Sequence, residues 1–183
     1  MLIIIDLQKA IDDPSWGIRN NPDAEIKIGE LLKHWRELDL PLLHVKHMST
    51  EPNSKYAPDT PTNAFKAVVE PRESEQVLEK SANSAFIRTD LDAMLQQRGI
   101  TELILVGVIT NNSVEATARM AGNLGYDTIV VSDATYTFNL VDYGGVAHSA
   151  EVVHNMALAN LDGEYAQIFI ATELIDATSK LSL

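Results

Sequence analysis

Three side chains with hydrolytic chemistry stand far apart in this sequence, each near the end of an apolar or extended segment. Asp6 closes the apolar run LIIID, Lys80 opens the segment KSANSAF, and Ser113 lies in a turn after the apolar run LILVG. A carboxylate exchanges protons, an ammonium favours nearby negative charge, and a hydroxyl can act as a nucleophile. Each residue alone also fits a structural role, as a turn cap, an exposed lysine or a helix N-cap. Their chemistry therefore depends on whether the fold brings them together.

The spacing of apolar residues predicts strands and helices that alternate along the chain. Apolar runs without polar alternation indicate strands covered on both faces, and apolar residues at helical spacing indicate helices. The predicted strands cover residues 2–6, 41–46, 75–79, 102–107, 128–132 and 167–171. The predicted helices cover residues 23–38, 89–98, 113–124, 147–161 and 172–180. Residues 47–74 have no clear period, and so long a loop in a compact domain is usually functional.

This order of elements predicts the α/β class: a three-layer α/β/α, Rossmann-like fold with a mainly parallel sheet of about six strands. Gly99, Gly125 and Gly163 each follow a predicted helix and precede a predicted strand, as glycines that end helices do. No internal repeat, low-complexity tract or linker divides the chain, so residues 1–183 are predicted to form a single domain.

The predicted topology also places the active groups. Right-handed crossovers put the loops that follow parallel strands on one edge of the sheet. We therefore expect Asp6, the loop after His44, the turn over residues 108–113 and the loop after Asp133 at the same carboxyl edge. Backbone N–H groups at a helix start favour negative charge in the crevice above such an edge.

The turn GVITNNSVEATA resembles the nucleophile turn of the isochorismatase-like cysteine hydrolases, whose pattern reads G-V-x-T-x-x-C-V-x-x-T-A. Only the cysteine is missing, and Ser113 stands in its place. The segments IIIDLQ, KSANSAF, TDLDAML and VSDAT match further motifs of that family in the same order. The resemblance runs from about residue 2 to about residue 175, and it implies the isochorismatase-like hydrolase fold.

The resemblance also implies a catalytic site. It assigns a triad to Asp6, Lys80 and residue 113, in which the lysine favours a thiolate and the aspartate accepts and returns the proton. It places an oxyanion hole at the backbone N–H groups of Ile109 and Ser113. It further implies a cis peptide bond between Val108 and Ile109, which would aim the Ile109 N–H at the oxyanion. The reaction implied is hydrolysis of a small amide or ureido C–N bond.

Serine at position 113 leaves the activity of this chain open. A hydroxyl is much harder to ionise than a thiol, and an Asp–Lys pair is a weak system for activating it. Four histidines lie outside the segments where the family places a base, so we interpret them as surface or packing residues: His44, His47, His148 and His154.

Three explanations of Ser113 remain. It can be an engineered, inactivating Cys→Ser change that traps substrate, or a natural variant of a non-catalytic protein that binds small molecules. Alternatively, the chain hydrolyses a vinyl ether without a nucleophile, as true isochorismatases do, with Asp6 as the acid. Those enzymes carry glycine at the matching position, whereas TNNSVE resembles the cysteine branch, so C–N hydrolysis is the first prediction.

Nicotinamidases of the superfamily hold a divalent metal through an Asp and several His residues after the second strand. His44 and His47 are three residues apart in a strand-to-loop segment, and no Asp-x-His motif follows, so we predict no catalytic metal. The substrate pocket is expected to lie above the sheet edge, and its predicted wall consists of Trp16, His47, Tyr56, Asn112, Tyr136 and Phe138.

Charge and composition exclude several other functions. The net charge of −12 argues against a nucleic-acid partner, and the apolar runs are far shorter than the roughly 20 residues that cross a membrane. The absence of cysteine and of a signal-peptide pattern predicts a cytoplasmic location.

No organic cofactor is implied, and the sequence lacks the phosphate loop after the first strand that an electron carrier of the flavodoxin type would need. The resemblance implies a homo-oligomer, a dimer or tetramer, acting on a small-molecule substrate.

Overall fold

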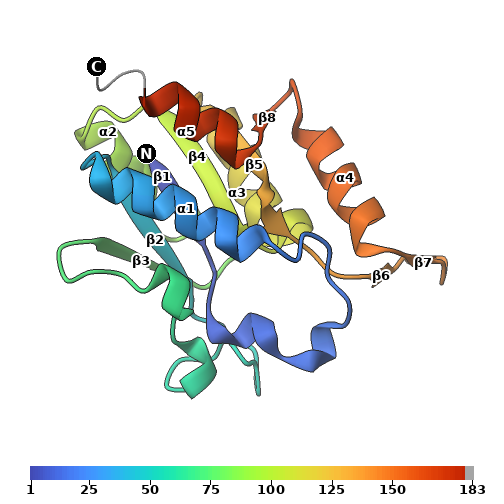
Figure 1. The fold of residues 1–183 in the computed structure, drawn as a ribbon. Coiled ribbons are helices and arrows are strands. Elements are labelled where there is room, and N and C mark those ends of the chain that lie inside the picture. The colour runs from blue at the N-terminus through green and yellow to red at the C-terminus, as the bar shows by residue number, and fades with distance from the viewer. Residues whose placement is uncertain (180–183) are drawn as a thin grey trace.

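A six-stranded parallel sheet forms the centre of the computed structural model, which describes residues 1–179 (Figure 1). The strand order is β3-β2-β1-β4-β5-β8, and every neighbouring pair is parallel. The strands are β1 (Leu2–Ile5), β2 (Leu42–His47), β3 (Gln76–Lys80), β4 (Glu102–Val108), β5 (Asp127–Tyr136) and β8 (Gln167–Phe169). The predicted α/β/α fold is therefore confirmed.

Helices cover both faces of the sheet. Leu2 and Ile4 of β1 pack into one core with helices α1 and α5, whereas Ile3 and Ile5 pack into the other with α2, α3 and α4. Because successive strand residues face opposite layers, both sets must be apolar, which explains the uninterrupted run at the start of the chain. The helices are α1 (Ala24–Glu37), α2 (Leu91–Gln97), α3 (Glu115–Asn123), α4 (Ala150–Leu161) and α5 (Ala171–Ser179).

Glycine at position 107 lets β4 approach β1 closely. Gly107 pairs with Ile5, its φ is +113°, and a Cβ at this position would clash with the Ile5 carbonyl oxygen. Any side chain at this position would push the two strands apart. The close approach places the turn after β4 directly beside the residue that follows β1.

Two predicted boundaries at the carboxyl end of the sheet are wrong, and a short ribbon there was not predicted. Strand β5 continues past residue 132 to Tyr136, with a register shift against β4. A short antiparallel ribbon follows, made of β6 (Leu140–Val141) and β7 (Ala147–His148). Helix α4 consequently begins at Ala150 and not at residue 147, and the Ser149 side chain caps it by accepting from the Val152 N–H.

The predicted loop over residues 47–74 lies against the carboxyl edge of the sheet. It contains two short 3₁₀ turns, Pro61–Asn63 and Ala67–Val69, and Gln8 forms an isolated bridge with Phe65. No helix within residues 1–179 has the length and apolar character needed to span a membrane. The predicted end of the last helix at residue 180, and the last four residues of the predicted domain, lie outside the described residues.

Candidate active site

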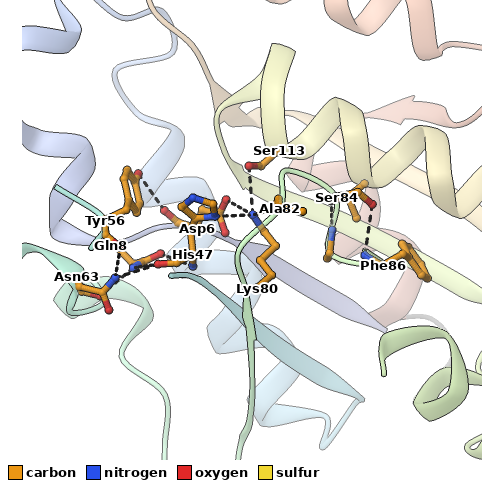
Figure 2. Close-up of polar contacts among 12 residues, drawn as sticks. Asp6, Gln8, His47, Tyr56, Asn63, Lys80, Ala82, Ser84, Phe86 and Ser113 are labelled. Atoms are coloured by element: carbon orange, nitrogen blue, oxygen red, sulfur yellow. Dashed lines mark hydrogen bonds and ion pairs between the residues drawn. The ribbon is translucent and has the colours of Figure 1, made fainter. Parts of the chain in front are cut away.

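The three side chains singled out from the sequence meet above the carboxyl edge of the sheet (Figure 2). Asp6 directly follows β1, Lys80 is the last residue of β3, and Ser113 lies in a single π-helical turn, Thr110–Val114, between β4 and α3. The Lys80 Nζ atom lies 2.6 Å from Asp6 Oδ2 and 3.3 Å from Ser113 Oγ. The ammonium group therefore bridges the carboxylate and the hydroxyl.

The backbone at Asp6 has an uncommon conformation. Its φ is +53°, in the left-handed region that L-residues other than glycine rarely adopt, although Asp tolerates it better than most. The Asp6 N–H donates to the Val45 carbonyl at 3.0 Å, and its own carbonyl accepts from the Gln8 N–H at 2.8 Å. These bonds hold the strained turn, which marks a position where the direction of the side chain matters.

The Lys80 side chain is fully buried and surrounded by polar partners. Besides Asp6 and Ser113, its Nζ lies 3.0 Å from the Ala82 carbonyl oxygen and 3.3 Å from Nδ1 of His47. An ammonium group has only three protons, so the two long contacts, to Ser113 and His47, compete for the third. The adjacent carboxylate compensates for the burial of this charge, which would otherwise be costly.

Burial also controls the acidity of the site. It raises the pKa of the Asp6 carboxyl, against the opposing charge and hydrogen bond of Lys80. The second oxygen, Asp6 Oδ1, is buried and accepts no hydrogen bond of standard geometry from the described residues, although the Ser113 hydroxyl is close enough to favour ionisation. A carboxyl group with a raised pKa and a free oxygen can take or give a proton.

The turn that carries Ser113 is fixed by its own backbone. The peptide bond between Val108 and Ile109 is cis, and the Ile109 carbonyl accepts from the N–H groups of Asn112 at 3.0 Å and Val114 at 3.3 Å. Ile109 and Ser113 both line a cavity at this edge of the sheet. The resemblance assigns the oxyanion hole to the N–H groups of these two residues, and this role stays a prediction.

The cavity has a volume of about 400 Å³, enough for a small molecule. Four of the six predicted wall residues line it, namely Trp16, His47, Tyr56 and Asn112. The remaining lining residues are Asp6, Ser15, Asn53, Ser54, Lys55, Asn83, Val108, Ile109 and Ser113. Asn53, Ser54 and Lys55 come from the long loop, whose irregular sequence gave no signal of which positions face inward.

Comparison with known proteins supports the resemblance seen in the sequence. The family model "Isochorismatase domain" matches residues 1–171. The isochorismatase family protein YrdC of Bacillus subtilis is 40% identical over 175 residues, which cover 96% of this chain and 94% of that protein. A crystal structure from the same family, from Chromobacterium violaceum, is 50% identical with a TM-score of 0.96, over 98% of this chain and 93% of the other.

This chain belongs to the isochorismatase family. A relative of known chemistry is the ureidoacrylate amidohydrolase RutB of an Enterobacter species, which is 33% identical over 113 residues. That match covers 62% of this chain and 45% of RutB. The isochorismatase family assignment makes the protein a member of a hydrolase family.

In this isochorismatase-family fold, two predicted wall residues lie elsewhere. Tyr136 is fully buried within β5, and its hydroxyl donates to Glu25 at 3.0 Å. The sequence prediction ended that strand too early and so placed Tyr136 in a loop. Phe138 stacks on Trp16 at 5.6 Å between ring centroids and borders a different cavity. The prediction that these two aromatic residues line the substrate cavity is corrected.

The sequence prediction missed the polar support beneath the cavity. The Gln8 side chain is fully buried; it donates to the carbonyls of His47 and Asn63 and accepts from the His47 N–H at 2.8 Å. Asn63 in turn donates to the carbonyls of His47 and Tyr56. Gln8 belongs to the motif IIIDLQ, which was the available signal for its importance.

The histidines occupy varied environments. His44 is fully buried and bonds Glu75 through Nε2 at 2.9 Å, whereas His154 is buried against the Thr110 hydroxyl at 2.9 Å.

Among residues 1–179 no three His, Asp or Glu side chains gather in a way that would hold a metal ion. The absence of a catalytic metal and of an organic cofactor stays a prediction.

Proposed function

We propose that this protein is built to hydrolyse a small amide or ureido C–N bond, and that serine at position 113 makes the reaction slow. The observation that carries the proposal is the bridge formed by Lys80, 2.6 Å from Asp6 and 3.3 Å from Ser113, at the wall of a small-molecule cavity. The similarity to an amidohydrolase that acts on a ureido compound supports the bond type.

In the proposed mechanism, residue 113 attacks the carbonyl carbon of the bound substrate. Asp6 accepts the proton from residue 113, and the Lys80 charge stabilises the anion that forms. The tetrahedral oxyanion is stabilised by the N–H groups of Ile109 and residue 113. Asp6 then returns the proton to the leaving nitrogen, and a water molecule hydrolyses the acyl-enzyme by the same steps.

Serine changes the first of these steps most. A thiol placed beside Lys80 ionises readily, whereas a hydroxyl must lose its proton to a carboxylate that is a much weaker base than the resulting alkoxide. Lys80 lies within 3.3 Å of Ser113 Oγ, where its charge would favour a thiolate. The sulfur atom is therefore what we expect the chain to need for rapid turnover.

The test is to restore the thiol. Purified protein and its Ser113→Cys variant are assayed against a panel of small amides, ureides and carbamates, with ammonia or amine release as the readout. We expect turnover at least about 100-fold faster in the Ser113→Cys variant. Ser15→Cys, which puts a thiol elsewhere in the same cavity, is the matched control and should gain nothing.

No turnover in either form would contradict the hydrolase and would favour the second candidate class, a non-catalytic protein that binds small molecules. Binding of panel compounds to the unmodified chain, measured by calorimetry, would then become the relevant activity.

One observation favours a second reaction. Burial raises the pKa of Asp6, and its Oδ1 has no standard hydrogen bond, which suits a carboxylic acid that protonates a vinyl ether. This route predicts that Ser113→Ala retains vinyl-ether hydrolysis and that Asp6→Ala abolishes it. Loss of that activity in both variants would exclude the nucleophile-free route.

The assembly of the protein is a separate proposal. The resemblance implies a homodimer or homotetramer, and the chain mass is 20.1 kDa. Size-exclusion chromatography with light scattering should give a multiple of that mass, and a single-chain mass would contradict the proposal. The cytoplasmic location stays a prediction.

A further inference from the structure

His47 is held by its backbone at the rim of the cavity. It is the last residue of β2 and lies opposite Lys80 in the register of the sheet. Its N–H donates to Gln8 Oε1 at 2.8 Å, and its carbonyl accepts from Gln8 Nε2 at 3.0 Å and Asn63 Nδ2 at 2.9 Å. Three hydrogen bonds with buried side chains fix the backbone of His47 and therefore the direction in which its side chain leaves the strand.

The ring of His47 is oriented by two neighbours. It packs edge-on against Tyr56, with 5.6 Å between centroids, and its Nδ1 lies 3.3 Å from Lys80 Nζ (Figure 2). An ammonium group can only donate, so Nδ1 must accept and carries no proton. The proton of the neutral ring then sits on Nε2.

A charged imidazolium does not fit this position. It would place a second positive charge 3.3 Å from Lys80. Burial lowers the pKa of His47, the Asp6 charge opposes this, and the Lys80 charge adds to it. The groups that face His47 are thus Asp6, Lys80 and the neutral Tyr56. Burial and the Lys80 charge outweigh the Asp6 charge and favour the neutral ring.

The environment of His47 differs from that of the other histidines. His34, His44, His148 and His154 each have a ring nitrogen bonded to a hydroxyl or carboxylate side chain. His47 instead contacts an ammonium, and within residues 1–179 its Nε2 has no hydrogen-bond partner. Nε2 is also not among the side-chain atoms that are buried without a partner. His47 therefore offers an unused N–H from the wall of the cavity.

We propose that His47 is a substrate-binding residue whose Nε2–H donates a hydrogen bond to an oxygen of the substrate, with Lys80 fixing the tautomer. This inference rests on the proposed hydrolase function and narrows its substrate class. The substrate carries a carbonyl or carboxylate oxygen within reach of His47, in addition to the carbonyl that residue 113 attacks. An N-acyl ureide, the amide of a keto acid or the monoamide of a dicarboxylic acid meets this requirement, whereas a simple alkyl amide does not.

The tautomer is tested without any substrate. Long-range ¹H–¹⁵N NMR spectra distinguish a protonated ring nitrogen from an unprotonated one, and loss of one ring system in His47→Gln assigns the signals. We expect the proton on Nε2 throughout neutral pH in the unmodified chain. A proton on Nδ1, or a doubly protonated ring at neutral pH, would overturn the proposal.

The hydrogen bond to substrate is tested by kinetics in the Ser113→Cys variant. His47→Leu fills the space without a donor and should raise KM for an acyl ureide about tenfold, with kcat changed far less. His47→Gln keeps a donor and should recover part of the loss. His148→Leu, which removes a histidine bonded to Asp142 in the surface ribbon, is the control and should leave both constants unchanged.

The outcomes separate the two proposals. An unchanged KM in His47→Leu, or an equal rise for acyl ureides and simple alkyl amides, overturns the role of His47 while the hydrolase stands. Absence of turnover in the Ser113→Cys variant removes the hydrolase proposal and with it the proposed substrate, whereas the NMR result still decides whether His47 presents a donor to the cavity.

Discussion

Two carboxylates near opposite ends of strand β3, those of Glu75 and Asp6, differ in how many hydrogen bonds they accept. Just before the strand, Glu75 accepts two bonds from Arg36, at 2.7 and 2.8 Å, and one from His44 at 2.9 Å. At the other end, Lys80 gives Asp6 a single bond at 2.6 Å and leaves Asp6 Oδ1 without one of standard geometry. One carboxylate is fully satisfied and the other is left with capacity for a proton.

The acidities follow from this difference. Although burial opposes it, the bonds from Arg36, the Arg72 N–H and His44 lower the pKa of Glu75 to about 2. Burial is the larger influence at Asp6 and raises its pKa despite Lys80. Deeper burial and fewer donors at Asp6 thus shift its pKa in the opposite direction from that of Glu75.

The volumes of the cavities beside Glu75 and beside Asp6 do not distinguish the two carboxylates. The cavity beside Arg36 and Glu75 has a volume of about 470 Å³, slightly more than the roughly 400 Å³ beside Asp6. The half-buried Glu75 carboxylate of this cavity is already paired with Arg36, and the cavity lies near the amino ends of β2 and β3, away from the turn at Ser113. A buried carboxylate with an unbonded oxygen and a raised pKa, and not the volume of the cavity, identifies the candidate active site.

The largest expected effect is on kcat, which should depend on Asp6 and not on Glu75. Asp6→Asn in the Ser113→Cys background should lower kcat about 1,000-fold, because it removes the group that moves the proton. Glu75→Gln should change kcat by no more than about twofold, because Glu75 touches no part of the cavity at Ser113. Similar losses in both variants would show that Asp6 has no special role.

The next effect concerns stability. Lys80→Met leaves the Asp6 carboxyl buried beside an apolar chain and should lower the free energy of unfolding by about 3–5 kcal/mol, because a buried charge loses its partner. The double variant Asp6→Asn/Lys80→Met removes both charges and should be less destabilised. Urea unfolding at neutral pH measures this, and equal losses in the single and double variants would argue against a coupled pair.

A smaller effect is the pH dependence at Glu75. Its folded-state pKa, about 2, lies below the ordinary value of 4.5, so its contribution is full above about pH 4.5 and is lost as pH falls toward 2. The contribution is at most about 3 kcal/mol. Glu75→Gln should therefore match the parent near pH 2 and be less stable above pH 4.5 in urea unfolding.

Asp6 should show the opposite sign. A raised folded-state pKa gives a contribution that is present at low pH and declines as pH rises through that pKa. The same unfolding series on Asp6→Asn, compared with the parent, would reveal it. If the parent instead becomes more stable relative to Asp6→Asn as pH rises, the raised pKa is contradicted.

The smallest expected effect is at the surface. Lys33 and Glu37 form an ion pair at 3.7 Å with side chains 78% and 59% exposed. Because water screens both charges, Lys33→Ala should leave the urea midpoint unchanged within error. A loss comparable to that of Lys80→Met would mean that burial is not what distinguishes the pair at Asp6.

The sequence by itself determined the fold and the family. Uninterrupted apolar strands alternating with amphipathic helices allow few arrangements besides a covered parallel sheet, and that topology sends Asp6, Lys80 and Ser113 to one edge. The motifs around those residues identified the family, which the comparisons then confirmed. Local patterns sufficed because these features depend on periodicity and on short segments.

Only the tertiary structure decided which side chains surround the site. Tyr136 faces the core because β5 continues past its predicted end, while Lys55 and Asn83 reach the cavity from irregular segments. The contrast between Asp6 and Glu75 depends on how deeply each carboxylate is buried and on how many donors reach it. Such contacts arise from the packing of residues far apart in the chain, and no local periodicity records them.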